Sequence, residues 1–470
     1  MVAVSTHASA QSGGNGSSRA DAVAAYWTPE RIASAQPRDL VVDGNGLGYL
    51  RRSDGGLTPY GHGKPARLTQ LPATSPGSPV PAARPGGGGD TAGPSVTVLE
   101  PLNGATVGAE VAFAATVTDD SGIRSVSFVI VYPNGTQSQS FTPNASGDTY
   151  STTLTGFTDG DWSWYVVAKD GAGRGGNTTT TQPTSFTVDT GVPPPPPPSG
   201  DDVANDRWPY GGDIQGAEGR ILFEMPTIKG KRVTWNAYVC SGTTVQDDNS
   251  GASIILTAAH CAYDDVAKEF ARNVLFIPNQ DATSGTGTDT NCNNDPIGCW
   301  APSYAVVDGN WTTRSFPDNV EWDYAYYVVQ PTSHTGAGGW TSLEDAVNEL
   351  PIGFSAGAAG GRTYALGYSY SDDPYFMYCT ETMQDEGNGV NWWLPNCDLS
   401  GGSSGGAWVQ PMDTATGSGP IISVNSWGYT NSPGMAGPFL DRSAECVFGA
   451  ANDETLIPTN RGIVVGGCTD

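Results

Sequence analysis

All eight cysteines of this 470-residue chain lie in its second half, between Cys240 and Cys468. An even number of cysteines in one part of a chain predicts disulfides within one folded unit, and disulfides form in an oxidising compartment. Metal binding is the alternative. However, the chain has no Cys-x-x-Cys pair and only four histidines. We therefore expect a disulfide framework, no metal site and no cofactor.

The composition favours short strands joined by turns. Sixty-three glycines and 35 prolines are too many for a helical protein, and the aromatic residues are mostly Tyr and Trp. The expected fold class is all-β, with a β-sandwich and a separate unit of paired antiparallel barrels.

The charge and hydropathy exclude two kinds of partner. A net charge of −26 repels phosphate backbones, so nucleic acid is not expected to bind. No run of 18 apolar residues occurs, so no membrane span is expected. Ala8-Ser9-Ala10 resembles a signal-peptide cleavage site, although the preceding residues lack a basic start and a full apolar stretch. Either the sequence begins within a truncated signal peptide or the match is chance. We favour the first and expect a secreted protein.

The first part of the chain, residues 1–93, is expected to be a leader. Its start is rich in Gly and Ser and predicts disorder, and residues 72–94 have the composition of a linker. Thr28 followed by Pro29 predicts the beginning of a short helix. The segment up to about residue 70 is too short and polar to hold its own core. We expect a disordered leader. Residues of about 11–90 are expected to serve as a pro-segment, because Ala24-Ala-Tyr26-Trp-Thr-Pro-Glu30 resembles the leader region of secreted bacterial peptidases.

Residues 94–189 predict a β-sandwich. Ser125–Tyr132 alternates so that Val126, Phe128, Ile130 and Tyr132 share one face, and Asp161–Ala168 is a second strand. With Leu102-Asn-Gly-Ala-Thr106 and Asp119–Ile123, this part resembles bacterial immunoglobulin-like modules.

A run of six prolines divides the chain. It occupies residues 193–198 within a linker at 190–202, and it predicts a stiff polyproline II spacer of roughly 20 Å. A Pro-rich recognition ligand is the alternative. Residues 203–470 form one large unit that holds every cysteine, with one helix expected at 342–350.

Three motifs in this unit carry chemistry. An apolar strand, Ser253–Ala259, leads to His260 and Cys261. Asp323 begins a second strand, and Ser404 lies in a glycine-rich turn. A serine hydroxyl needs a base to take its proton, and an imidazole needs a carboxylate to fix its tautomer. His260, Asp323 and Ser404 are therefore the expected catalytic triad.

These residues carry a family resemblance over about 215–470. Thr257-Ala-Ala-His260-Cys261 and Ser404-Gly405-Gly406 resemble the two signatures of chymotrypsin-like (trypsin-fold) serine peptidases. Finer features, such as Tyr238-Val-Cys240-Ser-Gly242, look like the bacterial V8-like (glutamyl-endopeptidase-type) members. The resemblance implies a secreted endopeptidase acting on polypeptides, an oxyanion hole from the N–H groups of Gly402 and Ser404, and a disulfide Cys240–Cys261. Sequential pairing of the other cysteines predicts Cys292–Cys299, Cys379–Cys397 and Cys446–Cys468.

The resemblance also implies substrate-binding residues. Ser426-Trp427-Gly428 resembles the strand whose backbone pairs with an extended substrate; a plain core strand is the alternative. Asp398 lies at the offset where trypsins carry their basic-specificity carboxylate. The neighbouring Cys of trypsins is missing, so cleavage after Lys or Arg is left open.

Two departures limit the resemblance. Ser403 stands where zymogen-activated relatives carry an Asp, so activation by insertion of a freed N-terminus is not expected. No His adjoins Trp427-Gly428, which argues against a preference for Glu. The rival hypothesis is a binding protein in which the trypsin-like unit is inactive. The immunoglobulin-like module would then bind a cell wall or polysaccharide through Trp162 and Trp164, unless those residues are core.

Overall fold

The computed structural model describes residues 19–44, 46–61, 69–70, 90–133, 138–157, 160–172, 175–189, 201–247, 251–289 and 291–468. Strands far outnumber helices in this part of the chain, so the molecule is mostly β. Several expected features lie outside the described residues: the cleavage-like site at 8–10, the disordered start, nearly all of the Pro/Gly linker, and the proline run at 193–198.

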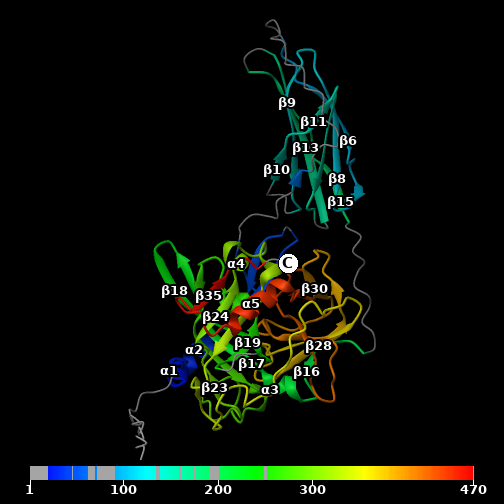
Figure 1. Ribbon diagram of the computed structural model, residues 1–470. Coiled ribbons are helices and arrows are strands. Elements are labelled where there is room, and N and C mark those ends of the chain that lie inside the picture. The colour runs from blue at the N-terminus through cyan, green and yellow to red at the C-terminus, as the bar shows by residue number, and fades with distance from the viewer. Residues whose placement is uncertain are drawn as a thin grey trace, which may run out of the picture.

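Two sheets form a sandwich from residue 69 to residue 188. Its strands are β5 (Thr69–Gln70), β6 (Ser95–Glu100), β7 (Ala105–Val107), β8 (Val111–Thr118), β9 (Ile123–Val131), β10 (Ser138–Phe141), β11 (Asn144–Ser146), β12 (Thr149–Thr155), β13 (Gly160–Asp170), β14 (Thr178–Thr180) and β15 (Thr184–Val188). One sheet has the order β10-β9-β13-β15-β7, with β14 beside β13. The other has the order β11-β12-β8-β6, with β5 beside β12. Figure 1 shows these strands running lengthwise in a body of their own.

The sandwich core is aromatic. Trp164 of β13 lies with its ring centroid 5.1 Å from that of Phe113 on β8 and 5.1 Å from that of Phe128 on β9. Trp162 is also buried. Both tryptophans are therefore core residues. The reading of them as a polysaccharide-binding surface is wrong, because the alternation of β13 turns them inward.

A ten-stranded sheet dominates the larger unit. Its strands are β1 (Gln36–Pro37), β17 (Glu218–Lys229), β18 (Arg232–Val245), β19 (Ser253–Thr257), β22 (Arg272–Pro278), β23 (Cys299–Trp300), β24 (Tyr304–Asp308), β25 (Ala325–Val329), β26 (His334–Thr335) and β35 (Gly462–Val465). The order is β26-β23-β22-β17-β18-β19-β25-β24-β35, with β1 beside β18.

Two further sheets and a two-stranded ribbon complete this unit. The five-stranded sheet contains β16 (Val203–Arg207), β27 (Arg362–Gly367), β28 (Met377–Thr382), β31 (Ala407–Val409) and β32 (Ile421–Val424). The seven-stranded sheet contains β2 (Asp39–Val42), β3 (Gly48–Arg51), β4 (Leu57–Pro59), β29 (Gln384–Asp385), β30 (Asn391–Leu394), β33 (Trp427–Tyr429) and β34 (Met435–Pro438). The ribbon is β20 (Tyr263–Asp264) with β21 (Glu269–Phe270).

Helices are few and short. They are α1 (Arg19–Tyr26), α2 (Pro29–Ser34), α3 (Asp213–Ala217), α4 (Gly309–Thr313), α5 (Arg442–Asn452) and the 3₁₀ turns η1 (Ala259–Cys261), η2 (Gln280–Ala282) and η3 (Val320–Trp322). Helix α2 begins as predicted: the side chain of Thr28 accepts a hydrogen bond from the N–H of Arg31, with Pro29 at the first position.

The helix expected at 342–350 is absent. Leu343, Val347 and Leu350 are buried at helical spacing, but the segment forms turns and ends beside β18. The N–H of Leu350 donates to the carbonyl of Thr244 at 3.3 Å, and Leu350 bridges in parallel to Val245. Pairing with a neighbouring strand therefore overrides the local pattern. The longest helix is instead α5, which packs against β24 and β25 (Figure 1).

Residues 19–44 and 46–61 of the leader are ordered and pack against the larger unit. Ala20, Val23, Trp27 and Ala35 join a buried cluster with residues of β17, β18 and β22. The indole N–H of Trp27 donates to the carbonyl of Asn273 at 2.7 Å. The expectation of a disordered leader is therefore wrong for residues 19–44 and 46–61. This segment has no core of its own and instead buries its apolar side chains in the core of another unit.

Four disulfides link the larger unit, and they are the expected pairs: Cys240–Cys261, Cys292–Cys299, Cys379–Cys397 and Cys446–Cys468. No helix in the described part of the chain combines the length and the apolar character of a membrane span.

Candidate active site

His260 is held at the end of a fully buried strand. All five residues of β19 are buried, because this strand lies between β18 and β25 in the large sheet. The turn η1 follows, and the disulfide Cys240–Cys261 ties it to β18. The hydroxyl of Thr257 donates to the carbonyl of Ser241 on β18 at 2.7 Å. The backbone around His260 is thus fixed on both sides.

Strand register brings Asp323 to His260. Thr257 of β19 pairs with Ala325 of β25 in antiparallel register, so the residues after β19 and those before β25 meet at one end of the sheet. Asp323 Oδ2 lies 2.7 Å from His260 Nδ1, and Asp323 Oδ1 accepts the backbone N–H of His260 at 2.8 Å. Both side chains are fully buried.

The loop of Ser404 packs against the same end of β19. The carbonyl of Ser404 accepts the N–H of Ser241 at 2.7 Å and lies 3.7 Å from Cys261 Sγ. Gly405 has φ +84°, and a Cβ on it would lie 2.2 Å from Thr257 Oγ1. Only glycine fits that approach. Ser404 is therefore placed beside η1 by contacts that a larger residue at 405 would break.

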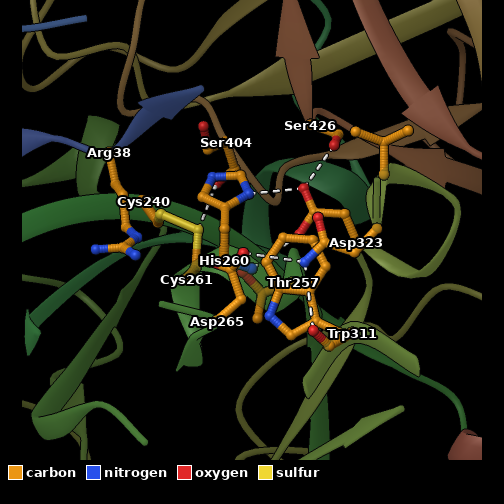
Figure 2. A network of polar contacts seen from close by, with 12 residues as sticks. Arg38, Cys240, Thr257, His260, Cys261, Asp265, Trp311, Asp323, Ser404 and Ser426 are labelled. Carbon is orange, nitrogen blue, oxygen red and sulfur yellow. Dashed lines mark hydrogen bonds and ion pairs between the residues drawn. A yellow bond between two sulfur atoms is a disulfide. The ribbon is translucent and has the colours of Figure 1, made fainter. Parts of the chain in front are cut away.

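Figure 2 shows Ser404 next to the ring of His260, with the Asp323 carboxylate on the other side of the ring. His260 Nε2 is buried and has no hydrogen-bond partner among the described residues, so the contact between His260 and the Ser404 hydroxyl is not closed in this state. Catalytic hydrogen bonds often form only when substrate is bound.

Gly402 and Ser404 are the residues expected to form an oxyanion hole. Gly402 has φ +100°, which favours glycine, and a Cβ there would lie 2.9 Å from the N of Tyr370. Neither the N–H of Gly402 nor that of Ser404 donates to another residue in the described parts of the chain. Two N–H donors near the serine therefore remain available to an anion.

Ser426 joins the network from a third sheet. Its hydroxyl donates to Asp323 Oδ2 at 2.5 Å, as Figure 2 shows. Trp427 and Gly428 follow in β33. Trp427 is buried, and β33 pairs with β34 on one side and with leader strand β2 on the other. The segment expected to align a substrate is thus a real strand that touches the candidate triad through Ser426.

A cavity of about 350 Å³ adjoins β33. Asp398 lines it together with Gly428, and the leader contributes Asp39 and Arg51. Asp398 is exposed, and its backbone N–H donates to the carbonyl of Ala204 at 2.8 Å. The four expected substrate-binding residues, Asp398, Ser426, Trp427 and Gly428, therefore lie around one strand and its adjoining cavity.

Sequence reasoning missed the residues that hold the Ser404 loop. The side-chain amide of Asn425 donates to the carbonyls of Leu366 and Ser403 at 2.7 and 3.0 Å. The hydroxyl of Ser241 donates to the carbonyl of Gly402 at 3.0 Å. Asn425 carries no sequence signal, because a single Asn beside a strand is common, and Ser241 stands in the Tyr238–Gly242 motif, which does not indicate this role. Their position next to Ser426 and Cys240 is the only hint.

A buried carboxyl group lies under the glycines that follow Ser404. Burial raises the pKa of Glu218 well above its ordinary value, and its side chain contacts the hydroxyl of Thr243. A Cβ on Gly406 would lie 2.9 Å from Glu218 Oε1. The raised pKa favours the neutral form of this carboxyl group beneath the loop.

Possible metal ligands lie in three groups among the described residues. Cys240, His260 and Cys261 are close together, but both cysteines are in a disulfide and offer no thiolate. The other two groups are acidic: Asp90 with Asp119 and Asp120, and Asp247 with Glu344 and Glu349. Neither acidic group includes a residue of the candidate triad.

Comparisons with known proteins leave the family open. No model of a protein family matches the chain, and no curated protein matches it. Among solved structures, the chain is similar to the endo-beta-1,4-mannanase from Thermotoga petrophila, with 16% identity and a TM-score of 0.18 over 21% of this chain and 20% of that one. It is also similar to fibronectin(III)-like modules of Clostridium thermocellum CbhA, with 22% identity and a TM-score of 0.16 over 20% of this chain and 97% of that one. A chimeric titin Z1Z2 shows 13% identity and a TM-score of 0.15 over 35% and 89% of the two chains. Scores this low carry no argument about function.

Proposed function

We propose that this chain is a secreted serine endopeptidase of the chymotrypsin-like type, with His260, Asp323 and Ser404 as its triad. The observation that carries the proposal is the double contact of Asp323 with His260, at 2.7 Å to Nδ1 and 2.8 Å to the backbone N–H. A buried carboxylate that holds an imidazole in this way beside a serine loop fits the needs of nucleophilic catalysis.

The first half of the reaction would form an acyl-enzyme. Ser404 Oγ attacks the carbonyl carbon of the peptide bond while its proton passes to His260 Nε2. The carbonyl oxygen becomes an oxyanion held by the N–H groups of Gly402 and Ser404, each worth about 3–4 kcal/mol by analogy with measured oxyanion donors. The C–N bond then breaks, and His260 returns the proton to the leaving amine.

The second half would release the new C-terminus. A water molecule gives a proton to His260 Nε2 as its oxygen attacks the ester carbon. The tetrahedral intermediate collapses, the bond to Ser404 Oγ breaks, and His260 reprotonates that oxygen. Asp323 holds His260 at Nδ1 throughout and stabilises the imidazolium that forms in both steps.

The arrangement of the sheets supports the proposal. The proposal includes a two-barrel fold for residues 203–470. His260 and Asp323 come from the ten-stranded sheet, Ser404 precedes β31 of the five-stranded sheet, and Ser426 precedes β33 of the seven-stranded sheet. A site assembled where sheets meet suits a cleft that receives an extended peptide. The four disulfides suit an oxidising, extracellular setting.

The proposal leaves open which substrate residue is preferred before the cleaved bond. The peptide would pair with the edge of β33, and the side chain before the cut would enter the cavity beside Asp398. Asp398 is exposed and lines that cavity. A preference for Lys or Arg before the cut therefore stays a prediction. Mapping the new termini in a digested, denatured proteome would report the preference directly.

The test of the proposal is Ser404→Ala. We expect loss of peptide hydrolysis by about 10⁴-fold or more, because the nucleophile is removed while the oxyanion donors remain. Ser371→Ala, an exposed hydroxyl that contacts the neighbouring Ser400, is the matched control and should keep activity. Assays use both the full chain and the chain after limited proteolysis. Wild-type turnover in Ser404→Ala would refute the assignment, and a folded wild type that stays inactive after limited proteolysis would favour the binding-protein hypothesis.

A further inference from the structure

Strand β33 has no free backbone edge in this structure. It pairs with β34 on one side and in parallel with β2 on the other, where Val41 lies opposite Gly428. The partner β2 comes from the leader, almost 400 residues earlier in the chain. A peptide that must pair with β33 therefore competes with β2 for the same hydrogen-bonding groups.

We propose that residues 36–42 are a built-in inhibitor that occupies the substrate edge of β33 and covers the catalytic residues until the leader is displaced. This inference rests on the proposed peptidase function, because it gives β33 the role of binding substrate. It deepens that function by assigning the regulation of the same site to a named segment.

The leader also covers the loop of the nucleophile. A Cβ on Gly401 would lie 2.7 Å from the Cβ atoms of both Pro37 and Asp39, so the leader lies directly on this glycine. Beneath it, Ser404 is 5% exposed and His260 is fully buried. Residues 37 and 39 thus lie against the loop that carries Ser404, where a bound polypeptide substrate would also have to lie.

A buried ion pair anchors the inhibitory segment. Arg38 is 1% exposed, and its Nη2 lies 2.8 Å from Asp264 Oδ2. The same nitrogen donates to the hydroxyl of Tyr60 at 2.6 Å, and Tyr60 contacts Asp265. Asp264 and Asp265 lie in and beside β20, just after the turn that carries His260. Leader and catalytic turn are therefore joined by a buried polar network, which is costly to break from one side.

Apolar contacts and a second arginine complete the attachment. Leu40 and Val41 are fully buried. Arg51 of β3 donates to the carbonyl of Tyr429, at the end of β33, at 2.8 Å. Because the segment belongs to the same chain, it docks without the entropic cost of association and holds the site at a high effective concentration. No disulfide joins residues 36–42 to the larger unit, so this segment can inhibit the site strongly and still be displaced from it.

The experiment measures how fast a fluorophosphonate probe labels Ser404 in four full-length proteins. They are the wild type, Leu40→Asp, Arg38→Ala and the control Leu57→Asp. Leu40 is fully buried in β2, whereas Leu57 is 41% exposed in β4 of the same leader. The two Leu→Asp changes are therefore chemically identical and differ only in whether they loosen β2. Thermal unfolding checks the fold of each protein, and Arg38→Ala decides the question if Leu40→Asp does not fold.

The inhibitor proposal predicts slow labelling of the wild type and of Leu57→Asp. Labelling should be at least about tenfold faster in Leu40→Asp and Arg38→Ala, because a buried charge or a broken buried pair displaces the strand. Amide exchange at residues 427–429 should accelerate in the same two variants. Equal labelling rates in all four proteins would overturn the inference and leave the peptidase function intact. Failure of every protein to label would overturn the peptidase function itself, and the inference with it.

Discussion

Asp323 is the residue on which the geometry of the site depends most. Its two oxygens accept three hydrogen bonds: Oδ2 accepts those from His260 Nδ1 and Ser426 Oγ, and Oδ1 accepts that from the His260 backbone N–H. All three partners are donors, so the position requires a group that only accepts. An ionised carboxylate meets this requirement and an amide does not.

The first prediction is that Asp323→Asn lowers kcat by about 10⁴-fold. Whichever way the amide turns, its NH₂ faces a donor. If the NH₂ faces the backbone N–H of His260, that hydrogen bond is lost. If it faces Nδ1, it donates to Nδ1 and selects the imidazole tautomer whose Nε2 cannot accept the serine proton. Steady-state kinetics measure the effect on the leader-released protein, which is the chain after limited proteolysis has removed the leader. Asp398→Asn is the control, and we expect its kcat on an uncharged substrate to be unchanged. A similar loss of kcat in both variants would contradict this role of Asp323.

Single residues were predictable from sequence only where they carry a motif. His260, Asp323 and Ser404 stand in recognisable surroundings, and the structure brings His260 and Asp323 into contact and places the Ser404 loop beside them. Ser241 and Asn425, which hold that loop, were not predicted. Their role comes from hydrogen bonds across strands that are far apart in sequence, and no local pattern encodes such bonds.

At the scale of elements, strand pairing outweighs local helical pattern. Residues 342–350 carry helical spacing but form turns that end against β18. Helix α5 forms instead, where Asp441 caps the helix and accepts the N–H groups of Ser443 and Ala444 at 3.0 and 3.4 Å. Its buried residues Ala444, Val447 and Ala451 face the large sheet.

The second prediction concerns this cap. Asp441→Ala should lower the free energy of unfolding by about 1 kcal/mol, because two N–H groups of the first turn lose their acceptor. Asp441→Asn keeps an acceptor oxygen and should retain most of that stability. Denaturant unfolding of the full chain measures both. If Asn is as damaging as Ala, the charge rather than the hydrogen bonds stabilises the helix.

At the scale of the whole molecule, the main surprise is the position of the leader. Its sequence predicted a segment without a core, and this holds, since its apolar residues pack into the larger unit. The prediction of disorder was wrong, because a segment without its own core can bury its apolar side chains in the core of another unit. The partner of β2 lies near the opposite end of the chain, so no sequence window contains both strands.

The third prediction is that docking of the leader depends on pH. Burial raises the pKa of Asp39 to about 6, and the charges of Arg51 and His260 lower it in part; Asp398 lines the same cavity. The docked state thus favours the protonated acid. Docking is strongest below about pH 4, the ordinary pKa of Asp, and weakens as the pH rises through about 6.

Amide exchange in a Ser404→Ala background, where no self-cleavage occurs, measures this dependence. Protection of residues 40–42, corrected for intrinsic exchange, should fall between about pH 4 and pH 7. Asp39→Asn removes the titrating group and should flatten the profile. A profile that is equally steep in Asp39→Asn would contradict this role of Asp39.

The central claim is that Ser404 is a nucleophile activated by His260. The most direct measurement is mass spectrometry of the leader-released protein after reaction with a fluorophosphonate. We predict a single adduct on Ser404, formed as its oxygen displaces fluoride from phosphorus, and no adduct in His260→Ala. An adduct on a different serine, or equal labelling of Ser404 when His260 is absent, would contradict the claim.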